Sequence, residues 1–138
     1  TPERLWEAIT DPEQRPAFHF GNTVESSWAT ASPWALTNPG FDGGPLADGE
    51  NVEVDPPRRL VQTMTAHWSP DAEALGATTV TWEIEAVGDD SCHLRLTHEM
   101  PEHAQEDIWG GWPMVLSGVK TYLETGETLT TPGSLMYG

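Results

Sequence analysis

The polar residue with the most potential for chemistry is His98, which lies in a stretch of alternating apolar and polar residues. It follows Leu94 and Leu96 at every second position, so an extended strand would place all three side chains on one face. The pKa of a histidine can be moved around neutrality, so His98 could act as a general base or hydrogen-bond a ligand. The alternative is a structural histidine paired with the backbone or with Glu99 or Glu102. His98 is the one candidate for a catalytic residue.

Three further polar residues could face the same interior. Gln62 and Ser26 lie on the apolar faces of two other predicted strands. His19 stands between two phenylalanines in a predicted turn, and the sequence leaves open whether it is a turn residue or a pocket residue. His67 is expected to face solvent, because it alternates with apolar neighbours in its strand.

Large aromatic residues dominate the predicted inner faces. The chain has seven tryptophans against two tyrosines and three phenylalanines. Any single tryptophan is more simply explained by core packing, but tryptophan needs room and a partner for its N–H, and the set as a whole favours an aromatic-lined pocket. With the polar candidates, the predicted ligand-binding residues are His19, Trp28, Trp34, Gln62, Met64, Trp68, Trp82, His98, Trp109, Trp112 and Val115.

Several other chemistries lack their motifs. The run from His98 to Asp107 is rich in histidine and carboxylates but has no HExxH or paired Cys/His spacing, so no metal site is predicted. Cys92 stands alone and no serine sits in a G-x-S-x-G turn, which leaves nucleophilic catalysis without support. The glycines between Gly40 and Gly49 do not lead from a strand into a helix, so they do not form a phosphate loop. No cofactor is expected.

Composition narrows the class of protein further. The chain has 138 residues, which suits one domain over 1–138 with a tail at 129–138. The formal net charge of −16 disfavours nucleic acid and anionic membranes as partners. The expected partner is an apolar small molecule, because of the predicted aromatic-lined pocket. The single cysteine fits a reducing compartment such as the cytoplasm. No apolar run is long enough to span a membrane, and no signal peptide is expected before Thr1.

The elements that would position these residues are mostly strands. Thr1-Pro2 predicts the start of one short helix, and Asp11 with Gln14 predicts a second that ends near Pro16. Period-two alternation then predicts antiparallel strands with one wet face. Their expected ranges are Thr23–Trp28, Pro33–Thr37, Glu50–Asp55, Arg59–Trp68, Thr79–Val87 and Ser91–Met100. The connections Asn38–Gly49 and Ser69–Ala77 are expected to be loops.

A long amphipathic segment, Gln105–Gly126, follows the strands. Its apolar residues recur at spacings of one and three, which is one face of a helix. Gly110, Gly111 and Pro113 predict a kink, or a helix that restarts at the proline. A strand-rich body followed by one long helix predicts an α+β fold in which a sheet curls around the helix. Such a fold can keep a hollow between its two layers.

Five segments in order resemble a known superfamily: TPERLWEAITDPE (1–13), ENVEVDPPRRLV (50–61), TTVTWEIEAVG (78–88), LRLTHE (94–99) and GGWPMVLSGVKTYLETGE (110–127). They are similar to the START-like (SRPBCC) helix-grip superfamily, and within it to the branch named after the activator of heat-shock-protein ATPase. The resemblance implies a seven-stranded antiparallel sheet that grips a long C-terminal helix, with a ligand cavity between them. The chain begins at the helix that usually follows the first edge strand, so that strand is expected to be absent here.

The superfamily includes lipid carriers, polyketide cyclases, hormone receptors, self-resistance proteins and co-chaperone domains, so fold alone does not fix function. The expected function is binding of a hydrophobic or aromatic small molecule between sheet and helix, for sequestration, transport or self-protection. One alternative is a polyketide cyclase/dehydratase-like enzyme that uses the same cavity, and another is a chaperone-interacting domain. An enzyme pocket should hold at least two converging polar groups, and a carrier needs one or none. The inward candidates leave this choice open.

Overall fold

The computed structural model describes residues 1–19, 21–38, 44–68, 70–74, 76–89, 91–99 and 112–127. Its elements, in chain order, are α1 (Pro2–Thr10), the 3-10 helix η1 (Arg15–Ala17), β1 (Thr23–Ser26), β2 (Pro33–Thr37), β3 (Ala47–Asp55), β4 (Arg59–Ala66), α2 (Pro70–Ala74), β5 (Ala77–Val87), β6 (Ser91–Glu99) and α4 (Trp112–Thr125).

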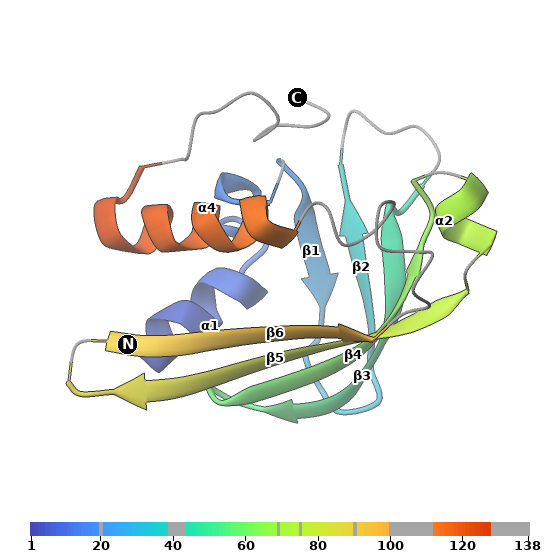
Figure 1. The fold of residues 1–138 in the computed structure, drawn as a ribbon. Helices are drawn as coiled ribbons and strands as arrows, with labels where there is room; N and C mark the ends of the chain where they lie inside the picture. The colour runs from blue at the N-terminus through green and yellow to red at the C-terminus, as the bar shows by residue number, and fades with distance from the viewer. Residues whose placement is uncertain are drawn as a thin grey trace.

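The strands form one sheet in which each pairs with the next along the chain. The order is β1-β2-β3-β4-β5-β6, and every pairing is antiparallel. Figure 1 shows β1 and β2 running at a steep angle to β5 and β6, so the sheet is strongly curved. Strands twist in one sense, and in a sheet of this size the twist accumulates into such a concave face.

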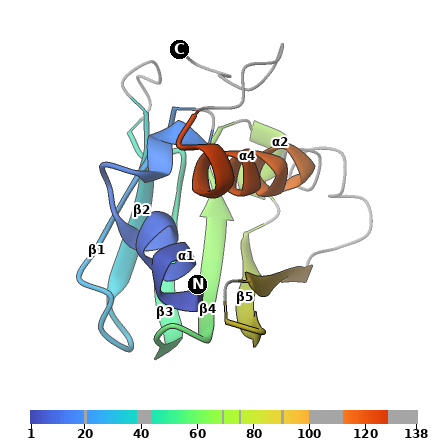
Figure 2. The same ribbon diagram turned by 90° about the vertical axis from the view of Figure 1, so that its left-hand side faces the viewer.

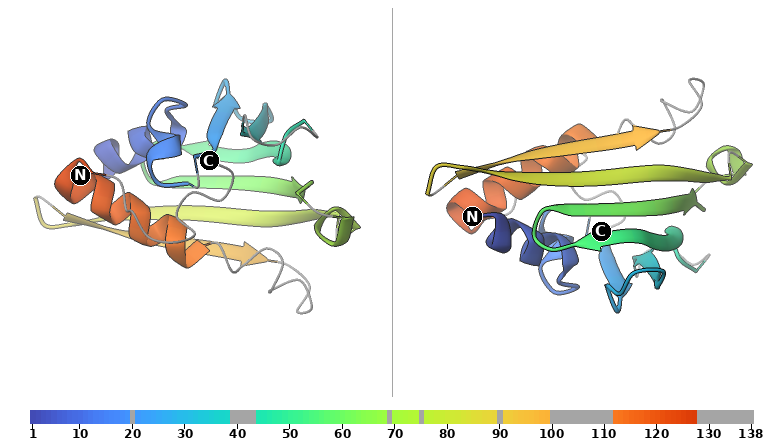
Figure 3. Two further views of the ribbon diagram at one scale, coloured as in Figure 1. Left: turned by 90° about the horizontal axis from the view of Figure 1, so that it is seen from above. Right: turned by 90° about the horizontal axis from the view of Figure 1, so that it is seen from below.

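Both longer helices cover this concave face. Figure 2 shows α1 and α4 on the same side of the sheet, and Figure 3 shows that the opposite side carries no described helix. The α+β helix-grip fold, a curved antiparallel sheet around a C-terminal helix, is therefore confirmed for the described part. The sheet has six described strands rather than the seven that the resemblance implies. No helix in the described ranges is long and apolar enough to cross a membrane.

The N-terminal helices differ in part from the prediction. Thr1 caps α1 by accepting a hydrogen bond from the Arg4 amide at 3.2 Å, as its residue type predicts. The second helix was placed too early, because the Asp11 carboxylate instead binds the Glu13 amide and the Gln14 side chain within a turn. The helical segment that follows is the single 3-10 turn η1. This turn directs the side chain of Arg15 into the interior.

The strands are those predicted, with shifted ends. β1 stops at Ser26 because Trp28 adopts a left-handed backbone with a φ of 60°, which no strand can continue. β3 starts earlier than expected, at Ala47, within a stretch predicted as loop. A bulge between Asn51 and Glu53 shifts its register against β4. As a result Asn51 is fully buried while Val52, an apolar residue of the predicted strand, is 50% exposed.

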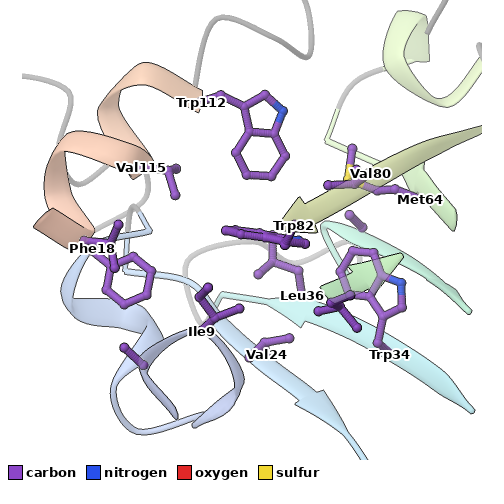
Figure 4. Close-up of a cluster of buried hydrophobic side chains, with 14 of the residues drawn as sticks. Ile9, Phe18, Val24, Trp34, Leu36, Met64, Val80, Trp82, Trp112 and Val115 are labelled. Carbon is purple, nitrogen blue, oxygen red and sulfur yellow. The ribbon is translucent and has the colours of Figure 1, made fainter. Parts of the chain in front are cut away.

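The core fills the space between the sheet and the helices. Figure 4 shows Trp112 pointing from α4 toward Trp82 on β5, with Val115 beside it. Gly118 lets α4 approach η1 closely, since a Cβ there would lie 3.1 Å from both the Cβ and the carbonyl oxygen of Phe18. The enclosed apolar residues are Leu5, Ala8, Ile9, Phe18, Val24, Trp34, Leu36, Leu46, Ala47, Leu60, Met64, Ala66, Val80, Trp82, Ile84, Trp112, Val115 and Val119.

The predicted C-terminal helix is described only from Trp112 onward. The predicted inner face is present there, with Trp112, Val115 and Val119 buried. Tyr122 and Leu123 pack partly buried against the same core. The earlier part of the prediction, residues 105–111, lies outside the described residues, as does the tail from residue 128.

Candidate functional site

Two tryptophans from opposite layers meet at the centre of the site. The rings of Trp82 on β5 and Trp112 at the start of α4 contact edge to face, with centroids 5.6 Å apart and planes at 88°. This is a favoured geometry for aromatic pairs, because the positive edge of one ring meets the negative face of the other. Both indoles also carry an N–H that must find an acceptor. The two acceptors come from different strands and define two polar chains.

The first polar chain joins α4 to β5 and β6 through His98. Trp112 Nε1 donates to His98 Nδ1 at 2.9 Å, so His98 carries its proton on Nε2 and donates it to Thr78 Oγ1 at 2.7 Å. The Thr78 hydroxyl in turn donates to the Met64 carbonyl at 3.1 Å. Burial lowers the pKa of His98 to about 4. At neutral pH His98 is therefore an uncharged residue with both ring nitrogens engaged.

The second polar chain starts at Trp82 and joins residues of four strands, β5, β4, β3 and β1. Trp82 Nε1 donates to Gln62 Oε1 at 3.3 Å, and Gln62 Nε2 donates to Asn51 Oδ1 at 3.0 Å. Asn51 Nδ2 then donates to the hydroxyls of Ser26 at 2.8 Å and Ser32 at 3.1 Å. The bulge in β3 turns Asn51 inward to make these contacts. This chain is also closed and uncharged.

Arg15 provides a charge beside these neutral groups. Its side chain is only 4% exposed, and its guanidinium carbon lies 5.2 Å from the centroid of the Trp82 ring. Arg15 Nη1 donates to the Ile9 carbonyl at 2.5 Å, and Nε donates to His19 Nδ1 at 3.0 Å. Burial lowers the pKa of Arg15 to about 9, so the guanidinium is still charged at neutral pH.

His19 lies next to both the arginine and the tryptophan of α4. It is buried, and its ring centroid is 6.0 Å from that of Trp112. Its pKa is held well below the usual value, first by burial and then by the charge of Arg15. The neutral ring can therefore accept the Arg15 hydrogen bond. The sequence left His19 open between turn and pocket, and the structure places it in the interior.

The remaining predicted site residues are dispersed. Gln62, Met64, Trp82, Trp112 and Val115 are buried between sheet and α4. Trp34 is buried too, but its Nε1 donates to the Thr63 carbonyl at 2.9 Å, away from the two chains. Trp28 and Trp68 are partly buried residues that follow β1 and β4. Trp109 lies outside the described residues.

Three residues of the site were not predicted. Arg15 stands in a polar N-terminal stretch, where an arginine normally faces solvent. Asn51 was missed because strand alternation cannot foresee a bulge. Thr78 was missed because the predicted β5 began one residue later, although its alternation with Val80 and Trp82 was a usable signal.

Two hollows are lined by described residues. A groove of about 450 Å³ runs between α1, the start of β6 and the later turns of α4. Its apolar lining includes Leu5, Cys92, Leu94, Leu116, Val119 and Leu123. An open depression of about 550 Å³ lies over β1, β2 and β3. No group of three His, Cys, Asp or Glu residues in the described ranges is arranged to hold a metal ion.

Solved structures with this fold come from several organisms. CalU16 from Micromonospora echinospora is 21% identical, with a TM-score of 0.67 over 91% of this chain. This chain spans 70% of CalU16 in the crystal structure and 64% in the solution structure. An HSP90 activator from Plasmodium falciparum is 25% identical, with a TM-score of 0.57 over 92% of this chain and 81% of that one. The Aha1 dimer from Colwellia psychrerythraea is 19% identical, with a TM-score of 0.65 over 91% of this chain and 90% of that one.

The comparison with curated proteins finds no match. A family model does match, and it covers most of the described fold. The match extends over residues 1–124, from the first helix to the last turn of α4. The chain therefore belongs to the family of activator of Hsp90 ATPase homolog 1-like proteins.

Proposed function

We propose that the protein binds a flat apolar small molecule between its sheet and α4, against the Trp82–Trp112 pair. The observation that carries this proposal is the convergence of polar side chains on two tryptophans inside an otherwise apolar layer. Arg15, His19, Gln62 and His98 come from four separate places in the chain and lie around the two rings. Apolar walls with a few convergent polar groups are the usual composition of a small-molecule site.

The way α4 is held supports entry of a ligand at this point. Trp112 is the first residue of α4, and its indole is linked to the sheet through the single chain that runs over His98. An edge-to-face contact with Trp82 completes this link. A flat molecule that entered between the Trp82 and Trp112 rings would replace the contact between the two rings with a contact to each of them, at small cost in buried apolar area.

Binding without chemistry fits His98 better than catalysis does. Four polar groups around the site would satisfy the requirement of an enzyme, but their partners are protein groups: Arg15 and His19 bond to each other, and Gln62 and His98 bond to the two tryptophans and to residues of the sheet. His98 uses both ring nitrogens, and a pKa of about 4 makes it a poor base at neutral pH. We therefore favour a carrier or sequestering protein over a cyclase or dehydratase.

The test is a titration with N-phenyl-1-naphthylamine, an uncharged aromatic probe whose emission rises in apolar surroundings. We expect micromolar affinity, a rise in probe emission and a fall in tryptophan emission. Trp112→Leu should weaken binding by about tenfold, the effect of losing roughly 1.4 kcal/mol of contact.

Two matched variants locate the probe. Trp6→Leu makes the same substitution on α1, outside the two polar chains, and should leave affinity within about twofold, a change of roughly 0.4 kcal/mol. Leu94→Ala alters the groove beside β6 and should also have little effect. Loss of binding in Leu94→Ala but not in Trp112→Leu would move the ligand to the groove. Absence of any binding would argue against the proposed function.

A second candidate is interaction with a chaperone of the Hsp90 type. It is favoured by the family description and by the HSP90 activator from Plasmodium falciparum among the similar structures. The measurement is the ATPase rate of an Hsp90 with increasing amounts of this protein. Stimulation that survives Trp112→Leu would assign the activity to an outer surface and not to the aromatic site.

A further inference from the structure

Arg15 is the one cation among the buried residues of the described part, apart from histidines whose pKa values are lowered. The ion pairs of the described ranges join exposed or partly exposed side chains, and none of them includes Arg15. Its pKa is lowered by burial with no compensating carboxylate. A buried charge without a partner costs several kcal/mol, so proteins rarely keep one without a purpose.

The donors of Arg15 are only partly used. Its Nε donates to His19 and one N–H of Nη1 donates to Ile9, while its face stacks on Trp82. A guanidinium has five N–H groups, so the second N–H of Nη1 and both of Nη2 are left. Every fully buried side-chain nitrogen and oxygen in the described ranges has a hydrogen-bond partner. No described acceptor binds Nη2, so this nitrogen is not among the fully enclosed atoms.

A structural role accounts for part of this arrangement. Ile9 lies in the last turn of α1, where carbonyl groups lack helical partners and the helix dipole favours a positive charge. One N–H of Arg15 satisfies this carbonyl. That role leaves unexplained the end of the guanidinium, where the parallel N–H groups of Nη1 and Nη2 have no described acceptor.

We propose that the bound molecule carries one carboxylate and that Arg15 binds it through Nη1 and Nη2, an inference that rests on the proposed function. The parallel N–H groups of a guanidinium match the two oxygens of a carboxylate. Trp82 and Trp112 would hold the aromatic body beside it. The neutral His19 and His98 add no second charge. With one cation in the site and a net charge of −16, a monoanion fits and a phosphate dianion does not.

The experiment compares two ligands of nearly equal shape by calorimetry at pH 7.5. 2-Naphthoate carries a carboxylate, and 2-acetylnaphthalene replaces one of its oxygens with a methyl group. We expect the wild-type protein to bind 2-naphthoate about 10–100-fold more tightly, as a charge-assisted hydrogen-bonded pair would give. The surface of this protein repels anions, so such a preference cannot come from long-range charge.

Arg15→Gln should abolish the preference, while its affinity for 2-acetylnaphthalene stays within about threefold of wild type, roughly 0.65 kcal/mol. Arg4→Gln is the matched control, because Arg4 is an exposed arginine on α1 with the same charge. It should keep the full preference. Should Arg15→Gln fail to fold, the Nε–H signal of Arg15 in the wild-type protein gives a second measurement, and 2-naphthoate should shift it more than 2-acetylnaphthalene does.

The outcomes separate the two proposals. Equal binding of both ligands by the wild-type protein, or tighter binding of 2-acetylnaphthalene, overturns the carboxylate assignment and leaves the proposed function standing. A preference that persists in Arg15→Gln overturns the role of Arg15. Failure of both ligands and of N-phenyl-1-naphthylamine to bind overturns the proposed function and the carboxylate assignment together.

Discussion

The polar groups on the two sides of the Trp82–Trp112 pair are organised differently. On the sheet side, His98 and Gln62 belong to closed chains in which every side chain is hydrogen-bonded to another protein group and no group is charged. On the η1 side, Arg15 is charged and forms no ion pair with a described carboxylate. Some of its N–H groups have no described acceptor. Closed chains fix the position of their members. A side chain with unused hydrogen-bond donors can bind a ligand with them.

This contrast implies different roles for residues of the same type. His98 and His19 are both histidines beside Trp112. His98 ties α4 to the sheet, whereas His19 holds one edge of the Arg15 guanidinium. The comparison predicts that changes in the closed chains alter stability and that changes around Arg15 alter ligand preference.

The largest effect is expected from removing the ring that both sides share. Trp82 is 1% exposed, so Trp82→Ala deletes a fully buried side chain and strands Gln62 Oε1. The free energy of unfolding, measured with urea, should fall by about 3–5 kcal/mol. A loss under about 1 kcal/mol would mean that Trp82 is not enclosed as described.

The next effect is a dependence of stability on pH. His98 and His19 have folded-state pKa values below the unfolded value, so the unfolded chain binds more protons at acid pH. Stability is therefore full above about pH 6.5 and falls as the pH drops toward 4, by up to roughly 3 kcal/mol from His98. Urea unfolding at a series of pH values measures the slope. His98→Gln should reduce this slope and leave the part that comes from His19, and an unchanged slope would contradict the described environment of His98.

A smaller effect is expected from opening the first polar chain. His98→Leu leaves Trp112 Nε1 without its acceptor and removes one of the two hydrogen bonds of the Thr78 hydroxyl, at a cost of about 1–3 kcal/mol. His93→Leu is the matched control, since His93 lies exposed on the outer face of the same strand. It should change stability by no more than about 0.5 kcal/mol. Similar losses in the two variants would show that the chain does not hold α4.

The smallest expected effect is a change in stability with the opposite dependence on pH. It comes from His67, a residue outside the site. His67 hydrogen-bonds Asp48 on β3 and Glu73 on α2, and these carboxylates raise its pKa. Its contribution is full below about pH 6.5 and is lost as the pH rises through the folded value. His67→Gln should remove this small dependence and leave ligand binding unchanged. A change in binding would extend the site to α2.

The sequence predicted the sheet and the face of α4 because both follow a simple period. Alternation places Gln62, Met64 and Trp82 on the inner face, where they are found. It failed at Asn51, where one bulged residue reverses the face, and at Trp28, where a left-handed backbone ends the strand. Arg15 could not have been predicted, because its burial depends on how η1 meets Trp82 and not on its neighbours in the chain.

The most direct test of ligand binding between sheet and α4 is a two-dimensional NMR spectrum of the seven indole N–H groups during titration with 2-acetylnaphthalene. Single Trp→Phe variants assign the signals. The largest shifts should belong to Trp82 and Trp112, whose N–H groups donate to Gln62 and His98. Trp34, which donates to the Thr63 carbonyl, serves as the internal reference and should hardly move. Shifts confined to tryptophans other than Trp82 and Trp112, or no shift at saturating ligand, would contradict the account.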